Sequence, residues 1–171
     1  MNDLIFERAL ALAKEAYEAG EIPVGAVIFR TDTKEIVAEA RNRTEELKDP
    51  TAHAEILCVQ KACQTLGIKR LVGYSLFVTV EPCAMCAGAI GWARLDGLYF
   101  GAYDPKTGGV MQGAQVFTHP QTHHKIKTEG GIRAKACGDL MTAFFKERRQ
   151  ERTKEPLQTK KYKKTRKTLD I

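Results

Sequence analysis

The sequence predicts a three-layer α/β/α sandwich in which helices cover both faces of a mixed sheet of about five strands. Segments with helical and strand spacing alternate along the chain in the order α, β, β, α, β, α, β. Helices separate the later strands, and parallel strands require such a crossover. The length of 171 residues suits about one domain, and 43% hydrophobic with 28% charged residues is normal for a globular protein.

Residues 3–19 form the first predicted helix, because apolar residues recur there at every third or fourth position. Asn2 or Asp3 is the candidate N-terminal cap of this helix. The β-prone runs 24–29 and 35–40 follow, and the polar segment RTDTK lies between them. Two short strands joined by a polar turn predict a β-hairpin.

Helical spacing returns after Pro50 and ends at Gly67. Residues 74–80 are predicted to form a strand, residues 82–93 a helix, and residues 95–103 contain another strand. Because a helix separates these two strands, we expect them to pair in parallel.

Residues 104–131 show no clear periodicity and are predicted to be mostly loop with short elements, and loops of this length are often functional. Residues 138–152 regain helical spacing, and Pro156 is expected to stop that helix. We therefore expect one domain over residues 1–152 and a basic C-terminal tail over residues 153–171.

The charge of the chain is unevenly distributed. Residues 146–171 hold eleven lysines and arginines against four acids, whereas the first 145 residues hold sixteen against seventeen. A nearly neutral body with a basic end indicates electrostatic binding of a polyanion, although a solvated terminus has the same composition.

No segment approaches the ~20 apolar residues that a membrane helix needs, and charges interrupt the N-terminal apolar positions. The sequence therefore predicts a cytoplasmic protein without a membrane span. Five cysteines, an odd number, do not suit a closed disulfide framework. Metal or redox chemistry is the better expectation for them.

Cys83 and Cys86 lie three residues apart, directly after a predicted strand and Pro82. Both thiols are thus expected on one face at a helix N-terminus, where the helix dipole favours the metal-binding thiolate. A lone Cys-x-x-Cys is also compatible with a redox pair, half of a four-cysteine zinc site, or core packing. The sequence holds no second Cys-x-x-Cys to complete a structural zinc site.

His53 and Glu55 begin the helix predicted after Pro50. Residues two apart point about 200° apart on an ideal helix, so only an end-on approach brings both to one place. If this helix and the next start at the same edge of the sheet, His53, Cys83 and Cys86 meet there with an acid nearby. Three protein ligands leave a fourth position for water, which indicates a catalytic zinc.

His-Ala-Glu, then twenty-six residues, then Pro-Cys-x-x-Cys resembles the zinc-dependent nucleoside and nucleobase deaminase superfamily. Within this superfamily the chain is most similar to the bacterial tRNA-specific adenosine deaminases, over residues 4 to about 152. The segments that carry this narrower resemblance are EIPVGAV (21–27), ARN (40–42), DPTAHAEI (49–56), TVEPCAMCAGAI (79–90), FGAYDPKTG (100–108) and FFKERRQ (144–150).

The resemblance implies a cytidine deaminase-like fold and hydrolytic deamination of adenosine to inosine at the wobble position of a tRNA anticodon. One zinc per subunit would be held by His53, Cys83 and Cys86, and would lower the pKa of water from 15.7 to about 7. Glu55 would take the proton from that water, deliver it to the ring nitrogen beside C6, and later protonate the departing ammonia.

The same resemblance implies a homodimer that binds a tRNA anticodon stem-loop, with a set of substrate-contacting residues. This set is Ile22, Asn42, Ala54, Asp104, Lys106, Thr107, Phe144, Phe145, Arg148 and Arg149. Tyr103, residues 108–117 and His123 depart from the family pattern.

Two other functions share these features. A deaminase of a free base or nucleotide, such as guanine or cytosine, would use the same zinc site without needing the Phe-Phe and Arg-Arg pairs or the basic tail. A noncatalytic, zinc-stabilised RNA-binding protein would need no acid beside the metal, so Glu55 argues against it.

Overall fold

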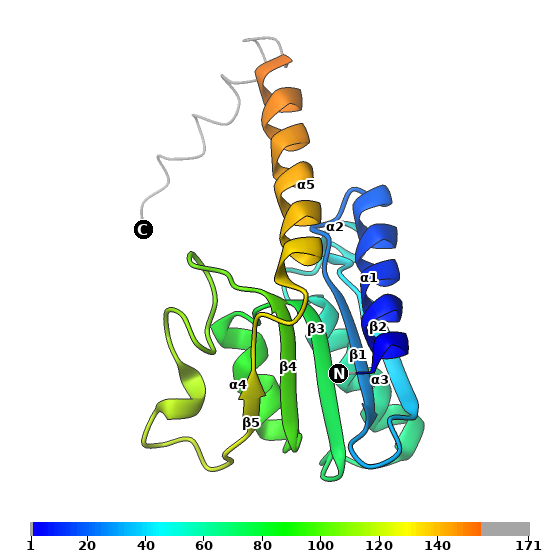
Figure 1. Cartoon of the computed structure of the whole chain (residues 1–171), viewed down its shortest axis with the longest axis vertical. Helices are drawn as coiled ribbons and strands as arrows, with labels where there is room; N and C mark the ends of the chain where they lie inside the picture. Colours follow the sequence, from blue (N-terminus) through cyan, green and yellow to red (C-terminus); the bar gives the residue numbers. More distant parts are fainter. Residues whose placement is uncertain (1, 155–171) are drawn as a thin grey trace.

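The computed structural model describes residues 2–154, which form a five-stranded mixed sheet covered on both faces by helices (Figure 1). The strand order is β2-β1-β3-β4-β5. β1 pairs antiparallel with β2 and β3, whereas β3, β4 and β5 run parallel to one another. The strands are β1 (Gly25–Arg30), β2 (Ile36–Arg41), β3 (Tyr74–Val80), β4 (Gly97–Ala102) and β5 (Lys127–Glu129). The predicted fold class and hairpin are confirmed.

Helices α1 and α5 cover one face of the sheet, and α3 and α4 cover the other (Figure 1). The helices are α1 (Asp3–Glu18), the single turn α2 (Thr44–Leu47), α3 (Ala54–Leu66), α4 (Ala84–Ala93), the 3-10 turn η1 (Val116–Thr118) and α5 (Ala134–Lys154). No helix within residues 2–154 is both long and apolar enough to cross a membrane.

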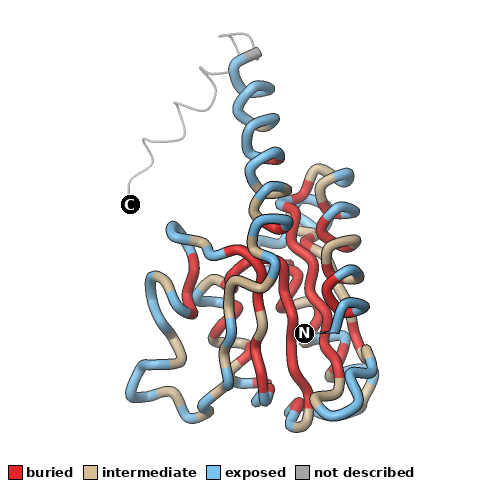
Figure 2. Tube along the Cα trace, viewed as in Figure 1, coloured by how far each residue is buried: buried red, intermediate tan, exposed pale blue. Residues whose placement is uncertain are grey.

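The sheet separates two apolar cores, so its central strands are buried on both faces (Figure 2). In β1, Ala26 and Ile28 belong to the core under α3 and α4, whereas Val27 and Phe29 belong to the core under α1. This alternation follows from the two-residue period of a strand. It explains why β1 and β3 appear in the sequence as continuous apolar runs.

Three predicted helix starts are wrong by a few residues. The helix predicted from residue 138 begins at Ala134, and its expected stop at Pro156 lies outside the described residues. The helix expected after Pro50 begins at Ala54, because the side chain of Asp49 accepts hydrogen bonds from Thr51 N and Thr51 Oγ1 at 2.8 and 2.7 Å and so forms a turn. The helix expected from residue 82 begins at Ala84. Asn2 does cap α1, since its Oδ1 accepts a bond from Leu4 N at 2.9 Å.

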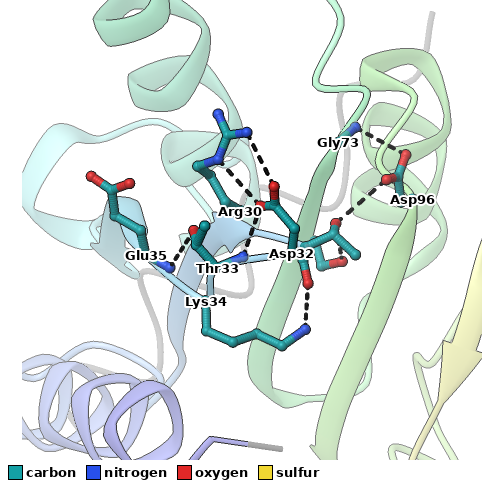
Figure 3. A network of polar contacts seen from close by, with 9 residues as sticks. Arg30, Asp32, Thr33, Lys34, Glu35, Gly73 and Asp96 are labelled. Atoms are coloured by element: carbon teal, nitrogen blue, oxygen red, sulfur yellow. Dashed lines mark hydrogen bonds and ion pairs between the residues drawn. The ribbon is translucent and has the colours of Figure 1, made fainter.

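A polar network fixes the end of the sheet at which β3 and β4 begin (Figure 3). Asp96 accepts hydrogen bonds from Gly73 N at 3.1 Å and from Thr31 Oγ1 at 3.4 Å, and Thr31 Oγ1 lies 3.0 Å from Ser75 Oγ. The network ties the β1–β2 turn to the starts of β3 and β4. The metal ligand Cys83 follows the opposite end of β3.

Candidate metal centre and active site

The starts of α3 and α4 converge where β3 ends. His53 is the N-cap of α3, Cys83 is the N-cap of α4, and Cys86 lies in the first turn of α4. His53 Nδ1 lies 3.5 Å from Cys86 Sγ and 3.8 Å from Cys83 Sγ, and the three ligand atoms all lie within 4.8 Å of one another. The convergence expected from the sequence is therefore present.

These three side chains fit a tetrahedral zinc ion. Zinc bonds of about 2.0–2.3 Å to nitrogen and sulfur place neighbouring tetrahedral ligands roughly 3.3–3.8 Å apart, and both distances from His53 Nδ1 lie in that range. One imidazole and two thiolates are also a donor set typical of zinc.

Cys83 is prepared for metal binding. A hydrogen bond with Cys86 and a second with His53 lower the pKa of the Cys83 thiol to about 4, while the same contact with Cys83 raises the pKa of the Cys86 thiol. The thiolate form of Cys83, which is the one that binds metals, is therefore favoured at neutral pH.

Glu55 lies in the first turn of α3, one residue beyond Ala54, and is almost fully buried at 4% exposure. Burial raises the pKa of its carboxyl to about 7. A carboxyl with a pKa near neutrality is suited to both taking up and giving up a proton. It lines the same cavity as His53 and Cys83.

The cavity beside these residues has a volume of about 710 Å³, within the range of small-molecule sites. Most of the residues predicted to contact substrate line it, namely Ile22, Asn42, Asp104, Lys106, Thr107, Phe145 and Arg149. The cavity is also lined by residues that were not predicted from the sequence to contact substrate, namely Val24, Val80, Glu81, Ala102, Tyr103, Pro105, Gly138, Met141 and Thr142.

The structure does not bring Ala54 to the cavity lining. The backbone N–H of Ala54 donates to Asn42 Oδ1 at 2.7 Å, and both residues are buried. Asn42 N in turn donates to Val24 O at 3.1 Å. Asn42 therefore fixes the start of α3, where His53 and Glu55 lie, as well as lining the cavity.

Phe144 and Arg148 also lie away from the cavity. Phe144 is buried edge-to-face against Tyr17, with ring centroids 5.5 Å apart. The Arg148 guanidinium lies 5.1 Å from the centre of the Phe144 ring and donates to the carbonyl of Gly20. Residues four apart share one helix face, so Phe144 and Arg148 fix α5 against the end of α1.

The adjacent helix face, which carries Phe145 and Arg149, borders the cavity. Phe145 is 41% exposed and Arg149 is exposed, so both side chains are available to a ligand. Of the four residues predicted to contact substrate on α5, Phe144 and Arg148 therefore position the helix. Phe145 and Arg149 border the cavity.

Asp104 shapes the loop that borders the cavity. Its Oδ1 accepts hydrogen bonds from Lys106 N at 2.9 Å and Thr107 N at 3.1 Å, and its Oδ2 accepts one from the Thr107 hydroxyl. Although burial opposes it, these bonds lower the pKa of the Asp104 carboxyl. Asp104 therefore acts on the loop conformation, while Lys106 and Thr107 remain exposed.

Two buried glutamates were missed in the sequence. Glu21 accepts bonds from Glu45 N at 2.9 Å and Glu46 N at 2.8 Å, and so caps α2. Burial opposes ionisation of Glu21, but these bonds lower its pKa overall. Glu81 accepts hydrogen bonds from Asp104 N at 3.2 Å and Met111 N at 2.8 Å, and so binds the loop that contains them. An acid between an apolar strand and a Pro-Cys pair, as at Glu81, was the available signal.

Three protein ligands with a buried acid beside them are the requirements of a hydrolytic zinc enzyme. In a sandwich with this strand order they define the zinc-dependent deaminase class. Residues 2–102 match the model of the cytidine and deoxycytidylate deaminase zinc-binding region, and the chain belongs to this family. His53, Cys83 and Cys86 form its zinc site.

Individual proteins and solved structures are similar to this chain to different extents. The tRNA-specific adenosine deaminase of Agrobacterium fabrum is 44% identical over 143 residues, which cover 84% of this chain and 93% of that protein. A structure solved in a study of A-to-I editing by tRNA:A34 deaminases is 42% identical with a TM-score of 0.79, and the match covers 81% of this chain and 99% of that one. Guanine deaminase from Bacillus subtilis is also 42% identical, but over 60% of this chain and 66% of that one, with a TM-score of 0.56.

Proposed function

We propose that the chain hydrolyses adenosine to inosine at the wobble position of a tRNA anticodon. The observation that carries this proposal is the extent of the similarity to tRNA-specific adenosine deaminases. At 42–44% identity it covers more than four-fifths of the chain, whereas the 42% identity to the Bacillus subtilis guanine deaminase covers 60%.

Zinc held by His53, Cys83 and Cys86 would act as a Lewis acid that makes water acidic enough to attack C6 of adenine at neutral pH. Glu55 takes a proton from the attacking water and delivers it to the ring nitrogen beside C6. It then takes the proton of the new C6 hydroxyl and gives it to the amino group, so that the C6–N bond breaks, ammonia leaves and the C6 carbonyl of inosine remains. The burial of Glu55 keeps bulk water from competing for these protons.

The walls of the cavity suit a nucleotide in a single-stranded loop. Phe145 offers an exposed aromatic face on which a splayed base can stack, and Arg149, one turn further along α5, can pair with a phosphate. Lys106 adds a second cation on the opposite loop. A free base needs neither of these cations, which favours RNA over the alternative substrate.

The decisive experiment incubates the purified chain with an anticodon stem-loop carrying adenosine at the wobble position, and separately with free adenosine, cytidine and guanine. We expect inosine in the RNA and one ammonia released per inosine. The matched control is the same stem-loop with guanosine in place of the wobble adenosine, which should release none. Turnover of guanine without inosine in the RNA would replace the proposal with the free-base deaminase that the Bacillus subtilis relative suggests.

The basic tail of residues 153–171 is proposed to bind RNA phosphates in the cytoplasm; residues 155–171 lie outside the described part of the chain and carry six lysines and arginines. A chain ending at Lys154 is expected to bind the stem-loop more weakly and with a shallower salt dependence. For each phosphate that the shortened chain no longer neutralises, the slope of log K against log salt should fall by about 0.7–0.9.

The measurement for the tail is a fluorescence titration of the stem-loop at four salt concentrations. A full-length chain in which those six cations are replaced by glutamine is the matched control for length, and it should show the same shallower slope. An unchanged slope in both variants would exclude the tail from binding.

A homodimer is proposed as the working state. Helix α4 presents Trp92 at 80% exposure and Met85 at 39%, and such exposed large apolar side chains are typical of an interface with a second copy. Trp92→Glu is expected to give a monomer by light scattering, because a buried unpaired charge opposes association. Val72→Glu, which changes another exposed apolar residue outside α4, is the control expected to remain dimeric. A wild-type chain of monomeric mass would contradict the proposal.

A further inference from the structure

Glu81 joins two parts of the active site that lie far apart in the sequence. It follows the last residue of β3 and precedes Pro82 and Cys83, and it is 3% exposed. Its carboxylate accepts four backbone hydrogen bonds. Oε2 accepts from Asp104 N at 3.2 Å, and Oε1 accepts from Val110 N at 3.2 Å, Met111 N at 2.8 Å and Gln112 N at 2.8 Å.

The two carboxylate oxygens therefore hold the two ends of one loop, residues 104–112. The first part of that loop, residues 104–107, lines the cavity. An ionised carboxylate offers acceptors on both oxygens and no donor, which matches four N–H groups. An amide at this position would place a donor against at least one of them.

The same loop docks on the segment that carries the metal ligand. Gly109 N donates to Pro82 O at 2.8 Å, and Gly108 pairs with Cys83 in an antiparallel bridge. Two glycines permit this approach. A Cβ added to Gly108 would lie 2.6 Å from Glu81 Cδ, and one added to Gly109 would lie 2.5 Å from the backbone nitrogen of Ala84. The loop is thus held against Glu81 and the start of α4 without room for a larger residue.

We propose that Glu81 is a positioning residue that fixes the cavity wall of residues 104–107 relative to the metal ligand Cys83. Its kinetic consequence rests on the proposed deamination of RNA. Glu55 lies in α3 and His53 is the N-cap of that helix, so this loop carries neither residue. Breaking the hydrogen bonds to Glu81 should therefore weaken substrate binding more than it slows the chemical step.

The test compares Glu81→Gln with wild type by hydrogen exchange of the backbone amides. Peptides within residues 104–112 should exchange at least about tenfold faster in the variant, because the amide cannot accept all four bonds. Zinc content should stay at one per chain. The KM for the stem-loop should rise about tenfold, with kcat changed less than about threefold.

Glu21→Gln is the matched control, because Glu21 is an equally buried glutamate whose carboxylate accepts N–H groups from Glu45 and Glu46. It should speed exchange around residues 44–46 and leave residues 104–112 unchanged. Gly108→Ala, which displaces the loop from the opposite side, should reproduce the local effect of Glu81→Gln even if that variant folds poorly.

Unchanged exchange in residues 104–112 of Glu81→Gln, or faster exchange spread evenly over the chain with loss of zinc, would overturn the positioning role. These outcomes are independent of the proposed function. If wild type does not deaminate the stem-loop, the proposed function fails, while the exchange and zinc measurements still decide the role of Glu81.

Discussion

Glu55→Ala is expected to lower kcat for inosine formation by at least about 10³-fold while the chain keeps its fold and one zinc. Transfer of one proton by a positioned side chain contributes roughly 10²- to 10⁴-fold, and Glu55 carries protons in two directions. Its carboxyl lies in the first turn of α3, and the cluster of three metal-binding atoms is complete without it. Zinc binding should therefore survive the substitution.

The measurement for Glu55 is single-turnover conversion of the stem-loop, together with zinc analysis and thermal melting. Glu55→Gln is the matched variant, because it keeps the size of the buried side chain but removes the group that exchanges the proton. Both variants should be equally inactive and hold zinc equally well. Activity within about tenfold of wild type in either variant would remove Glu55 from the mechanism.

Cys86→Ala is expected to have the second large effect, which is loss of the metal together with activity. Cys86 is fully buried in the first turn of α4, and it supplies one of the three ligand atoms that the described residues bring together. Removing only an outer-shell partner costs a metal site about 10- to 100-fold in affinity, so losing one of three ligands should cost more than about 100-fold. The melting temperature in zinc should also fall, because metal binding to the folded state stabilises it.

Zinc retained after dialysis against a chelator is the measurement for Cys86. Cys58→Ala is the matched control, since Cys58 is an equally buried cysteine on α3, and its Sγ lies 3.6 Å from Ala26 O rather than at the metal site. It should retain zinc at the wild-type level. If the Cys86 variant kept one zinc through the same dialysis, the three-ligand assignment would be wrong.

The element order and the metal ligands could be predicted because both are recorded in local patterns. Two-residue and 3.6-residue periods give the strands and helices, and the Cys-x-x-Cys spacing indicates a shared helix face. β5 could not be predicted in the same way. Its three residues show no apolar alternation, and the strand exists because Lys127 to Glu129 pair with Gly97 to Tyr99 of β4.

The hydrogen bonds that buried carboxylates accept could not be predicted from the sequence either. The backbone partners of Glu81 lie 23 to 31 residues further along the chain, so no short motif records them. Periodicity likewise groups Phe144 with Arg148 and Phe145 with Arg149, but it does not say which pair faces α1 and which borders the cavity. Tertiary packing decides that choice.

The network of Thr31, Ser75 and Asp96 lies where β3 and β4 begin, whereas the metal ligand Cys83 follows the end of β3. Selection for thermal tolerance and selection for a new substrate should therefore act on different ends of the same strands. In directed evolution, substitutions around the β1–β2 turn that raise the stability of the fold should offset the stability lost through later substitutions in residues 104–112. Residues 104–112 are thus the part of the molecule in which changes alter the substrate cavity, and the network at the β1–β2 turn is the part in which changes alter stability.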